Sequence, residues 1–228
     1  CGTGRGKNNS PCATPNRQRA EHAAREKLSG RAKVSPPPIR FNDGAAYERM
    51  MGQWSRLAGN VFLDWLGADT NKRWVDVGCG NGAFSEVVME RCSPASLVGF
   101  DPSPEQLDFA RGRPKTAGAR FEQGDAMDLP LRDDSVEVAT MALVLFFVPE
   151  PATGIAEMRR VVAPGGLVAA YSWDVLNGGF PLNAIQEELR AMGHTPPLPP
   201  SAESSRFEAM TSLSVSYTHL TLPTMIGV

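Results

Sequence analysis

The chain alternates short β-rich runs with helical segments, and this alternation constrains its fold more than any other feature. Five strands are expected, at 73–77, 96–100, 119–122, 136–145 and 167–173. A helical pattern follows the first strand, with Phe84, Val87 and Val88 at positions i, i+3 and i+4. Strands separated by helices pair in parallel, so the sequence predicts an α/β protein with a doubly wound parallel sheet flanked by helices.

Helix boundary signals fit this pattern. Ser103, Pro104 and Gln106 occupy the N-cap, N1 and N3 positions of a helix that begins directly after the second strand. A further helix is expected over 151–162, before a turn at 164–166, and a helix-like stretch covers 204–213.

Charge is distributed unevenly between the tail and the body of the chain. Residues 1–40 carry nine Lys and Arg but two Asp and Glu, whereas the rest carries 14 basic and 23 acidic residues. Because residues 1–40 have no aromatic residue and contain three consecutive prolines, they are expected to be a disordered basic tail or a spurious upstream extension. The acidic body argues against a nucleic-acid partner.

The other end of the chain breaks the pattern. Residues 215–228 resemble a translated sequencing adapter and are expected not to be native, which leaves 41–214 as the folded domain. The longest apolar run, 138–148, has eleven residues, too few to span a bilayer. No signal peptide is visible, and the four cysteines lack metal-ligand or disulfide spacing, so a cytoplasmic protein is expected.

Acidic residues mark the ends of the predicted strands, where doubly wound sheets bind ligands. Asp76, Asp101 and Asp125 lie at or just after three strand ends, and the loop 78–82 is rich in glycine, which allows close backbone approach. Asp101, 19 residues beyond Gly82, suits the diol of a ribose. Asp125 suits an adenine amino group, so an adenosine site is predicted.

Electrostatics favour one adenosine cofactor over another. Gly78, Gly80 and Ala83 also fit the dinucleotide fingerprint, so an NAD-dependent oxidoreductase is an alternative. However, Asp76 would repel a pyrophosphate, and no Lys or Arg lies between Val75 and Met89. S-adenosyl-L-methionine carries a sulfonium and an ammonium group, which an acid beside the loop suits. In the other interpretation, Asp76 only orders the turn by accepting hydrogen bonds from loop amides.

Four motifs in order resemble those of class I S-adenosylmethionine-dependent methyltransferases, most closely the type 11 domain of the ubiquinone/menaquinone C-methyltransferase branch. The motifs are 75–82 (VDVGCGNG), 98–103 (VGFDPS), 124–126 (GDA) and 157–166 (EMRRVVAPGG), and the resemblance covers about 41–173. It implies a Rossmann-like sheet of seven strands. Because the sequence before residue 215 has no segment for the last two, the fold is expected to be C-terminally truncated, with an unpaired sheet edge.

The resemblance also implies residue roles. Gly78 and Gly80 would contact the methionine part and Asp101 the ribose. The remaining positions are Gln106, Asp125 and Ala126 around the adenine and Met141 near the methionine end. Gln106 has a second interpretation, in which it only completes the capping box.

An amphipathic helix is expected over 44–65, because Tyr47, Met51, Trp54 and Val61 recur at helical spacing. Two interpretations of this face are open. It packs in the core, or, as in the resembling family, it covers the cofactor with Tyr47 and Trp54.

The implied reaction is in-line methyl transfer to a small-molecule acceptor, which alignment and exclusion of water can accelerate. His194, the one histidine within 41–214, is expected to be a surface residue, so no catalytic residue is predicted. Phe146 and Phe147 stand where related enzymes often have polar residues, which predicts either a hydrophobic acceptor pocket or buried core. A non-catalytic fragment that binds S-adenosylmethionine is a further alternative. The sequence does not define the oligomeric state.

Overall fold

Five parallel strands form one sheet in the order β3-β2-β1-β4-β5. The computed structural model describes residues 44–67, 69–196 and 198–205, all within the unit Ile39–Val228. The strands are β1 (Arg73–Val77), β2 (Ser96–Asp101), β3 (Arg120–Gln123), β4 (Val136–Ala142) and β5 (Val162–Tyr171). The predicted doubly wound α/β sheet is confirmed. The predicted tails 1–40 and 215–228, and any strand beyond 205, lie outside the described residues.

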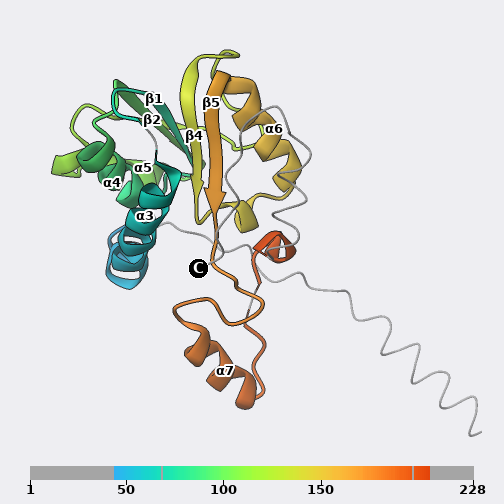
Figure 1. The fold of residues 1–228 in the computed structure, drawn as a ribbon. Coiled ribbons are helices and arrows are strands. Elements are labelled where there is room, and N and C mark those ends of the chain that lie inside the picture. The colour runs from blue at the N-terminus through green and yellow to red at the C-terminus, as the bar shows by residue number, and fades with distance from the viewer. Residues whose placement is uncertain (1–43, 68, 197, 206–228) are drawn as a thin grey trace, which may run out of the picture. The chain divides into compact units, whose positions relative to one another are not determined.

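Helices cover both faces of the sheet (Figure 1). The α-helices are α2 (Gly44–Tyr47), α3 (Gln53–Leu66), α4 (Ala83–Cys92), α5 (Pro104–Arg111), α6 (Pro151–Val161) and α7 (Asn183–Ala191). A π-helix, η1 (Glu48–Gly52), joins α2 to α3, and short 3₁₀ turns are η2 (Pro114–Thr116), η3 (Leu145–Phe147) and η4 (Ala202–Ser205). Helices α3, α4 and α5 lie on one face and α6 on the other.

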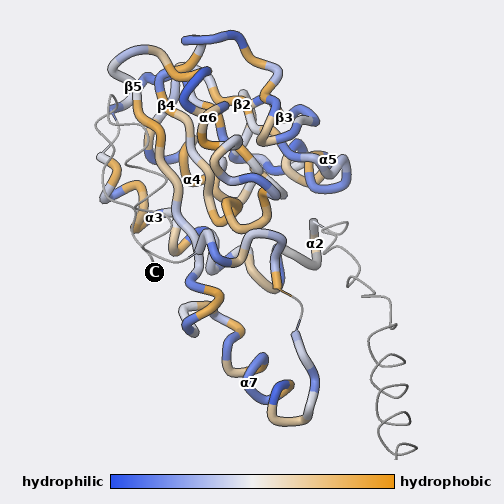
Figure 2. Tube along the Cα trace, turned by 90° about the vertical axis from the view of Figure 1, so that its right-hand side faces the viewer, coloured by the Kyte–Doolittle hydropathy of each residue, from blue (hydrophilic) through white to orange (hydrophobic). Residues whose placement is uncertain are grey.

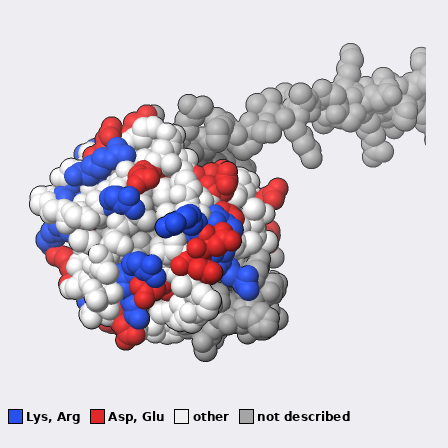
Figure 3. Space-filling model, turned by 90° about the horizontal axis from the view of Figure 1, so that it is seen from above, with Lys and Arg blue, Asp and Glu red and all other residues white. Residues whose placement is uncertain are grey.

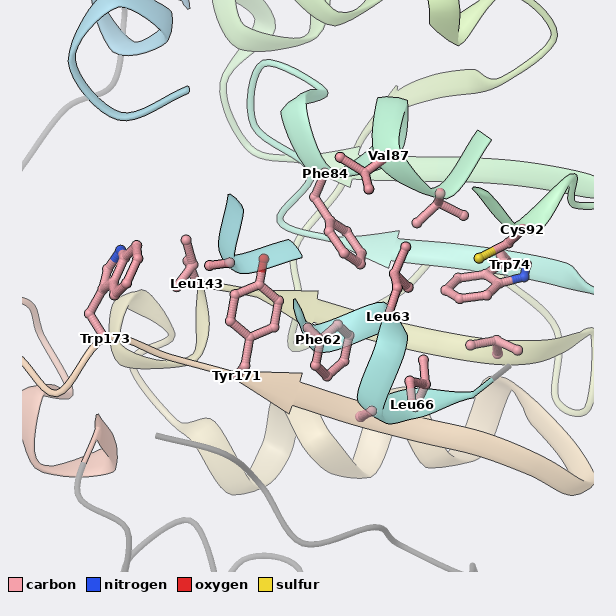
Figure 4. Packing of buried hydrophobic residues seen from close by; sticks show 14 of the residues in the cluster. Phe62, Leu63, Leu66, Trp74, Phe84, Val87, Cys92, Leu143, Tyr171 and Trp173 are labelled. Atoms are coloured by element: carbon pink, nitrogen blue, oxygen red, sulfur yellow. The ribbon is translucent and has the colours of Figure 1, made fainter. Parts of the chain in front are cut away.

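Alternate residues of β1, β2, β4 and β5 enter two separate apolar layers, whereas the edge strand β3 buries only Phe121. Trp74 of β1 and Tyr171 of β5 face α3 and α4, where the Phe62 ring lies 4.6 Å from Tyr171 and 5.8 Å from Phe84 between centroids (Figure 4). The opposite layer packs Val75 and its neighbours against α6. Sheet residues are therefore buried on both sides, as parallel strands require.

Two predicted strand limits are wrong. The strand predicted over 136–145 ends at Ala142, because Leu143 has a φ of 62°, which no strand accommodates. The strand predicted over 167–173 begins at Val162, and the expected turn at 164–166 is an irregularity within β5. There the register jumps from Val162 to Leu167 along β5 while β4 advances by two residues, as in a bulge.

The N-terminal helical segment was predicted correctly in extent, but its buried face is wrong. Trp54 and Val61 are 47% and 53% exposed, and their neighbours Ser55 and Phe62 are buried. Met51, Ser55 and Phe62 lie at i, i+4 and i+11, so the buried face runs through Ser55 and Phe62 and leaves Trp54 and Val61 on its exposed side. The core-packing interpretation therefore fails for Trp54, whereas Met51 is buried as expected.

Helix α7 follows β5 and has no buried residue. Hydrophobic and hydrophilic residues alternate along it (Figure 2), with Ile185, Leu189 and Met192 exposed at i, i+4 and i+7. The helix-like stretch predicted over 204–213 begins with the 3₁₀ turn η4 and otherwise lies outside the described residues. Among the helices of the described segments, none has the length and apolarity needed to cross a membrane.

Candidate functional site

The glycine-rich loop lies where the strand order reverses. Strand β1 pairs with β2 on one side and β4 on the other, and the helices that follow β1 and β4 cover opposite faces. The loop 78–82 therefore begins at the topological switch point, at the carboxyl edge where doubly wound sheets bind ligands.

Backbone hydrogen bonds fold this loop over the end of β2. The amides of Gly78 and Cys79 both donate to the Phe100 carbonyl oxygen, at 2.7 and 2.9 Å. Gly78 and Gly80 have φ values of 74° and 50°, in the left-handed region that favours glycine. A Cβ on Gly80 would meet no atom within 4 Å, so this Cα borders open space into which a ligand can approach.

Asp101 joins the loop to the second strand end. Its Oδ2 accepts a hydrogen bond from the Gly80 amide and its Oδ1 one from the Ser103 amide, each at 2.9 Å. Burial raises the pKa of this carboxyl, and the two amides oppose the rise. Since each carboxylate oxygen has two lone pairs, acceptor capacity remains for a ligand hydroxyl.

Asp76 lies beneath the loop and is fully buried. The Ser85 hydroxyl of α4 donates to its Oδ2 at 2.5 Å, whereas Oδ1 has no hydrogen-bond partner in the described part of the chain. Burial raises the pKa of Asp76 to about 7. Its hydrogen-bond donor is thus Ser85 and not a loop amide, contrary to the interpretation in which Asp76 orders the turn.

The residues predicted around the adenine follow β2 and β3. The Gly124 amide donates to the Asp101 carbonyl oxygen at 3.3 Å, which brings the next turn beside Asp101. In that turn Asp125 is exposed, with Oδ1 accepting from the Met127 amide at 2.8 Å, and Ala126 is half-buried. Gln106 is buried in the first turn of α5. Its backbone N–H donates to the N-cap hydroxyl of Ser103, as the capping pattern predicts.

The fourth strand end closes the other side of the loop. A Cβ on Gly78 would collide with Val144 Cγ1 and lie 2.6 Å from Val144 Cγ2, so Val144 lies directly against this glycine. Met141, predicted near the methionine end, buries its side chain in the layer beneath α6, which leaves its backbone for any contact at the edge. Phe146 belongs to the core and Phe147 is half-buried against it.

Sequence reasoning missed Ser85 and Val144. Ser85 interrupts an apolar helix face between Phe84 and Val87, a signal that a polar partner lies beneath it. Val144 carried no signal, because it lay inside a run interpreted as strand. The side chain of Tyr47 is outside the described residues, and no group of three or more His, Cys, Asp or Glu that could hold a metal ion is found in the described segments.

Comparison with known proteins agrees with this geometry. A family model described as a methyltransferase domain matches residues 75–170. Over 115 residues the chain is 37% identical to a demethylmenaquinone methyltransferase of Deinococcus radiodurans, a match that covers 50% of this chain and 46% of that protein. Residues 75–170 therefore carry a methyltransferase domain.

Two further similarities cover three quarters of the chain. An uncharacterized 37.1 kDa protein in transposon TN4556 of Streptomyces fradiae is 34% identical over 179 residues, covering 75% of this chain and 51% of that protein. A solved S-adenosylmethionine-dependent methyltransferase from Thermotoga maritima shares the fold, with a TM-score of 0.51, 23% identity and coverage of 75% and 74%. The chain spans about half the length of the Streptomyces and Deinococcus relatives.

Proposed function

We propose that this methyltransferase binds S-adenosyl-L-methionine at the carboxyl edge of β1 and β2 and transfers its methyl group to a small hydrophobic acceptor. The hydrogen bond from the Gly80 amide to Asp101 carries the proposal. It holds the loop against a carboxylate that still has lone pairs for a ribose diol, while the Cα of Gly80 borders open space.

Each predicted site residue whose side chain the structure describes has a role in this proposal. Asp101 accepts hydrogen bonds from the ribose, and the backbone of Gly78, Gly80 and Met141 lines the methionine end. Asp76 favours a cationic ligand through its charge, because it is buried beneath the loop and has one oxygen without a hydrogen-bond donor. The adenine lies among Gln106, Asp125 and Ala126.

The chain's contribution to the reaction is binding and orientation. When bound, S-adenosylmethionine supplies a methyl group on a positively charged sulfur that departs as a neutral thioether. The protein must hold the acceptor in line with that bond and exclude water from it. This requires no acid or base unless the acceptor loses a proton, so no catalytic side chain is assigned.

Two observations support the choice of acceptor, and a third concerns nucleic acid. The Deinococcus relative is named for demethylmenaquinone, a hydrophobic small molecule. After the end of β4, Val144 and Phe147 are both half-buried and apolar. Figure 3 shows the end of the molecule opposite this carboxyl edge, and on that face basic and acidic side chains are interspersed and do not form the basic field that a nucleic-acid site needs.

The alternatives have less support. An NAD-dependent oxidoreductase would place a pyrophosphate over Asp76 in a loop region without Lys or Arg. The family model and the named relative are methyltransferases, which also favours methyl transfer. A non-catalytic binding protein would share the ligand and differ only in turnover.

Calorimetric titration of the full 228-residue chain with S-adenosylmethionine, S-adenosylhomocysteine and NAD tests the proposal. Asp101→Asn should weaken S-adenosylmethionine binding about tenfold or more, the scale of one charge-assisted hydrogen bond. Asp108→Asn is the matched control, because Asp108 is an exposed acid on α5 that pairs with Arg111. Absence of S-adenosylmethionine binding by folded wild-type protein, or tighter binding of NAD, would overturn the proposal.

Transfer of a radiolabelled methyl group to demethylmenaquinone then tests the acceptor. Saturable cofactor binding without transfer to this or other hydrophobic acceptors would favour the non-catalytic alternative.

A further inference from the structure

A buried arginine lies behind the glycine loop, outside the residues assigned to the cofactor. Arg113 follows α5 and is almost fully buried. Its Nε donates to the backbone carbonyl oxygen of Asn81 and its Nη1 to Glu86 Oε2, both at 2.6 Å, and its Nη2 pairs with Glu48. One guanidinium group thus connects the loop, α4 and the π-helix η1.

Asn81 makes the same connection through its side chain. Its Nδ2 donates to Glu48 Oε2 at 2.9 Å and to the Gly44 carbonyl oxygen at 3.3 Å, and its Oδ1 accepts from the Ala83 amide at 3.2 Å. The last part of the loop is therefore fixed to residues of three different segments.

Gly52, the last residue of the π-helix, leaves room for the Glu48 side chain. A Cβ on Gly52 would lie 2.5 Å from the Glu48 Cδ, so any larger residue there would displace this carboxylate from its present position. Turns of π-helix are rare and are frequently found at functional sites.

The charges of the cluster balance. Arg56 donates to Glu48 Oε1 at 2.8 Å and to Glu86 Oε2 at 3.4 Å. Lys115 pairs with Glu86 at 3.6 Å and with Glu90 at 2.6 Å, so three cations and three carboxylates are joined. Buried ion pairs contribute little to stability compared with apolar packing, because desolvation offsets their attraction. Such a cluster instead fixes the relative positions of the segments that it joins, and here one of these segments is the loop 78–82.

We propose that Arg113 is a positioning residue for cofactor binding. Together with Glu48 it holds Asn81, and thereby keeps Gly80 where its amide meets Asp101. The loop is then held on two sides, by Asp101 at Gly80 and by Arg113 at Asn81. This inference rests on the proposed function, because it assigns the loop to S-adenosylmethionine.

The test compares Arg113→Met with Arg91→Met in the full chain. Arg91 also connects α4 to α3, through the Asn60 carbonyl oxygen and Asp64. In the described part of the chain, none of its hydrogen bonds reaches the loop. Two measurements are made on each variant: amide hydrogen exchange of residues 78–83 without ligand, and affinity for S-adenosylmethionine by calorimetry.

Arg113→Met should accelerate exchange of the loop amides and raise the Kd for S-adenosylmethionine about tenfold, the scale of one lost charge-assisted hydrogen bond. In turnover, KM for the cofactor should rise and kcat should change little. Arg91→Met should lower the melting temperature without either effect. If Arg113→Met does not fold, Glu48→Gln provides the same comparison, because it removes one charge and keeps the side-chain shape.

Exchange and affinity equal to wild type in the folded Arg113 or Glu48 variant would overturn the inference. Equal losses in the Arg91 variant would also overturn it, because the effect would then be one of general stability. If the wild type itself does not bind S-adenosylmethionine, the proposed function fails, while the exchange of the loop amides still decides whether Arg113 positions the loop.

Discussion

The hydroxyl of Ser85 donates a 2.5 Å hydrogen bond to Asp76, joining the first turn of α4 to the end of β1 beneath the glycine loop. This is the one donor recorded for a fully buried carboxyl group, whose second oxygen has no hydrogen-bond partner in the described residues. Burial raises the pKa of Asp76 to about 7, and the Ser85 hydrogen bond opposes the rise.

Asp76 should therefore make folding stability depend on pH. In the unfolded chain its pKa lies near 3.9, so between about pH 4 and 7 the folded state keeps a proton that the unfolded state has lost. The free energy of unfolding should fall as pH rises through this window, by up to about 1.4 kcal/mol per pH unit. Asp76→Asn should abolish this contribution, as urea unfolding at pH 5 and pH 8 would measure. The exposed Asp125→Asn is the control, and an Asp76→Asn profile parallel to wild type would contradict the expectation.

The same carboxyl should couple cofactor binding to proton release. A cationic ligand beside Asp76 stabilises the ionised form and lowers its pKa, so binding near pH 7 expels a proton. Titrations of S-adenosylmethionine in phosphate and in Tris at pH 7 should then differ in observed enthalpy, because the two buffers take up protons with different heats. The difference should disappear in Asp76→Asn. If Asp76→Asn releases as many protons as the wild type on binding, another group is their source.

Gly78 and Gly80 should respond differently to alanine. Both have positive φ, which costs a residue with a Cβ about 1–2 kcal/mol. In addition, only at Gly78 would the new Cβ collide with the Val144 side chain. Gly78→Ala should therefore lower the free energy of unfolding more than Gly80→Ala, and Val144→Ala added to Gly78→Ala should partly restore it. Urea unfolding of the three variants measures this, and failure of Val144→Ala to recover stability would show that the collision is not the cause.

The displaced face of α3 predicts a contrast between two aromatic residues. Trp54→Gln should change the free energy of unfolding by no more than about 0.5 kcal/mol, because Trp54 is half-exposed. Phe62→Ala should cost about 3–5 kcal/mol, since its ring packs between Phe84 and Tyr171. Chemical denaturation of both variants tests this, and a large loss in Trp54→Gln would mean that the ring is covered in solution.

The strands and most helices could be predicted because their signals are local. Periodicity, the Ser103 cap and the glycine loop located the elements that place Asp76 and Asp101 at the carboxyl edge. Errors arose where an apolar run did not imply extended backbone. Leu143 and Leu145 are as apolar as β4, yet a left-handed residue and a 3₁₀ turn follow the strand.

The supports of the site could not be predicted, because they join segments far apart in sequence. Arg113 meets Asn81 and Glu48 across 32 and 65 positions, and an isolated arginine after a helix gives no sign of such partners. The π-helix was also hidden, since residues 48–52 carry no proline or helix-breaking run and read as ordinary helix.

The π-helix η1 begins at Glu48 and leads into α3, so the orientation of the Glu48 side chain and the packing of α3 on the sheet can change independently. Loss of a single exposed residue there, such as Met50, would let the backbone continue as a regular α-helix through 44–66. Residues after the turn would keep their packing on the sheet, while Glu48 would rotate out of phase with Asn81 and Arg113. A one-residue deletion there would leave a folded protein in which Glu48 no longer holds Asn81 and the end of the glycine loop.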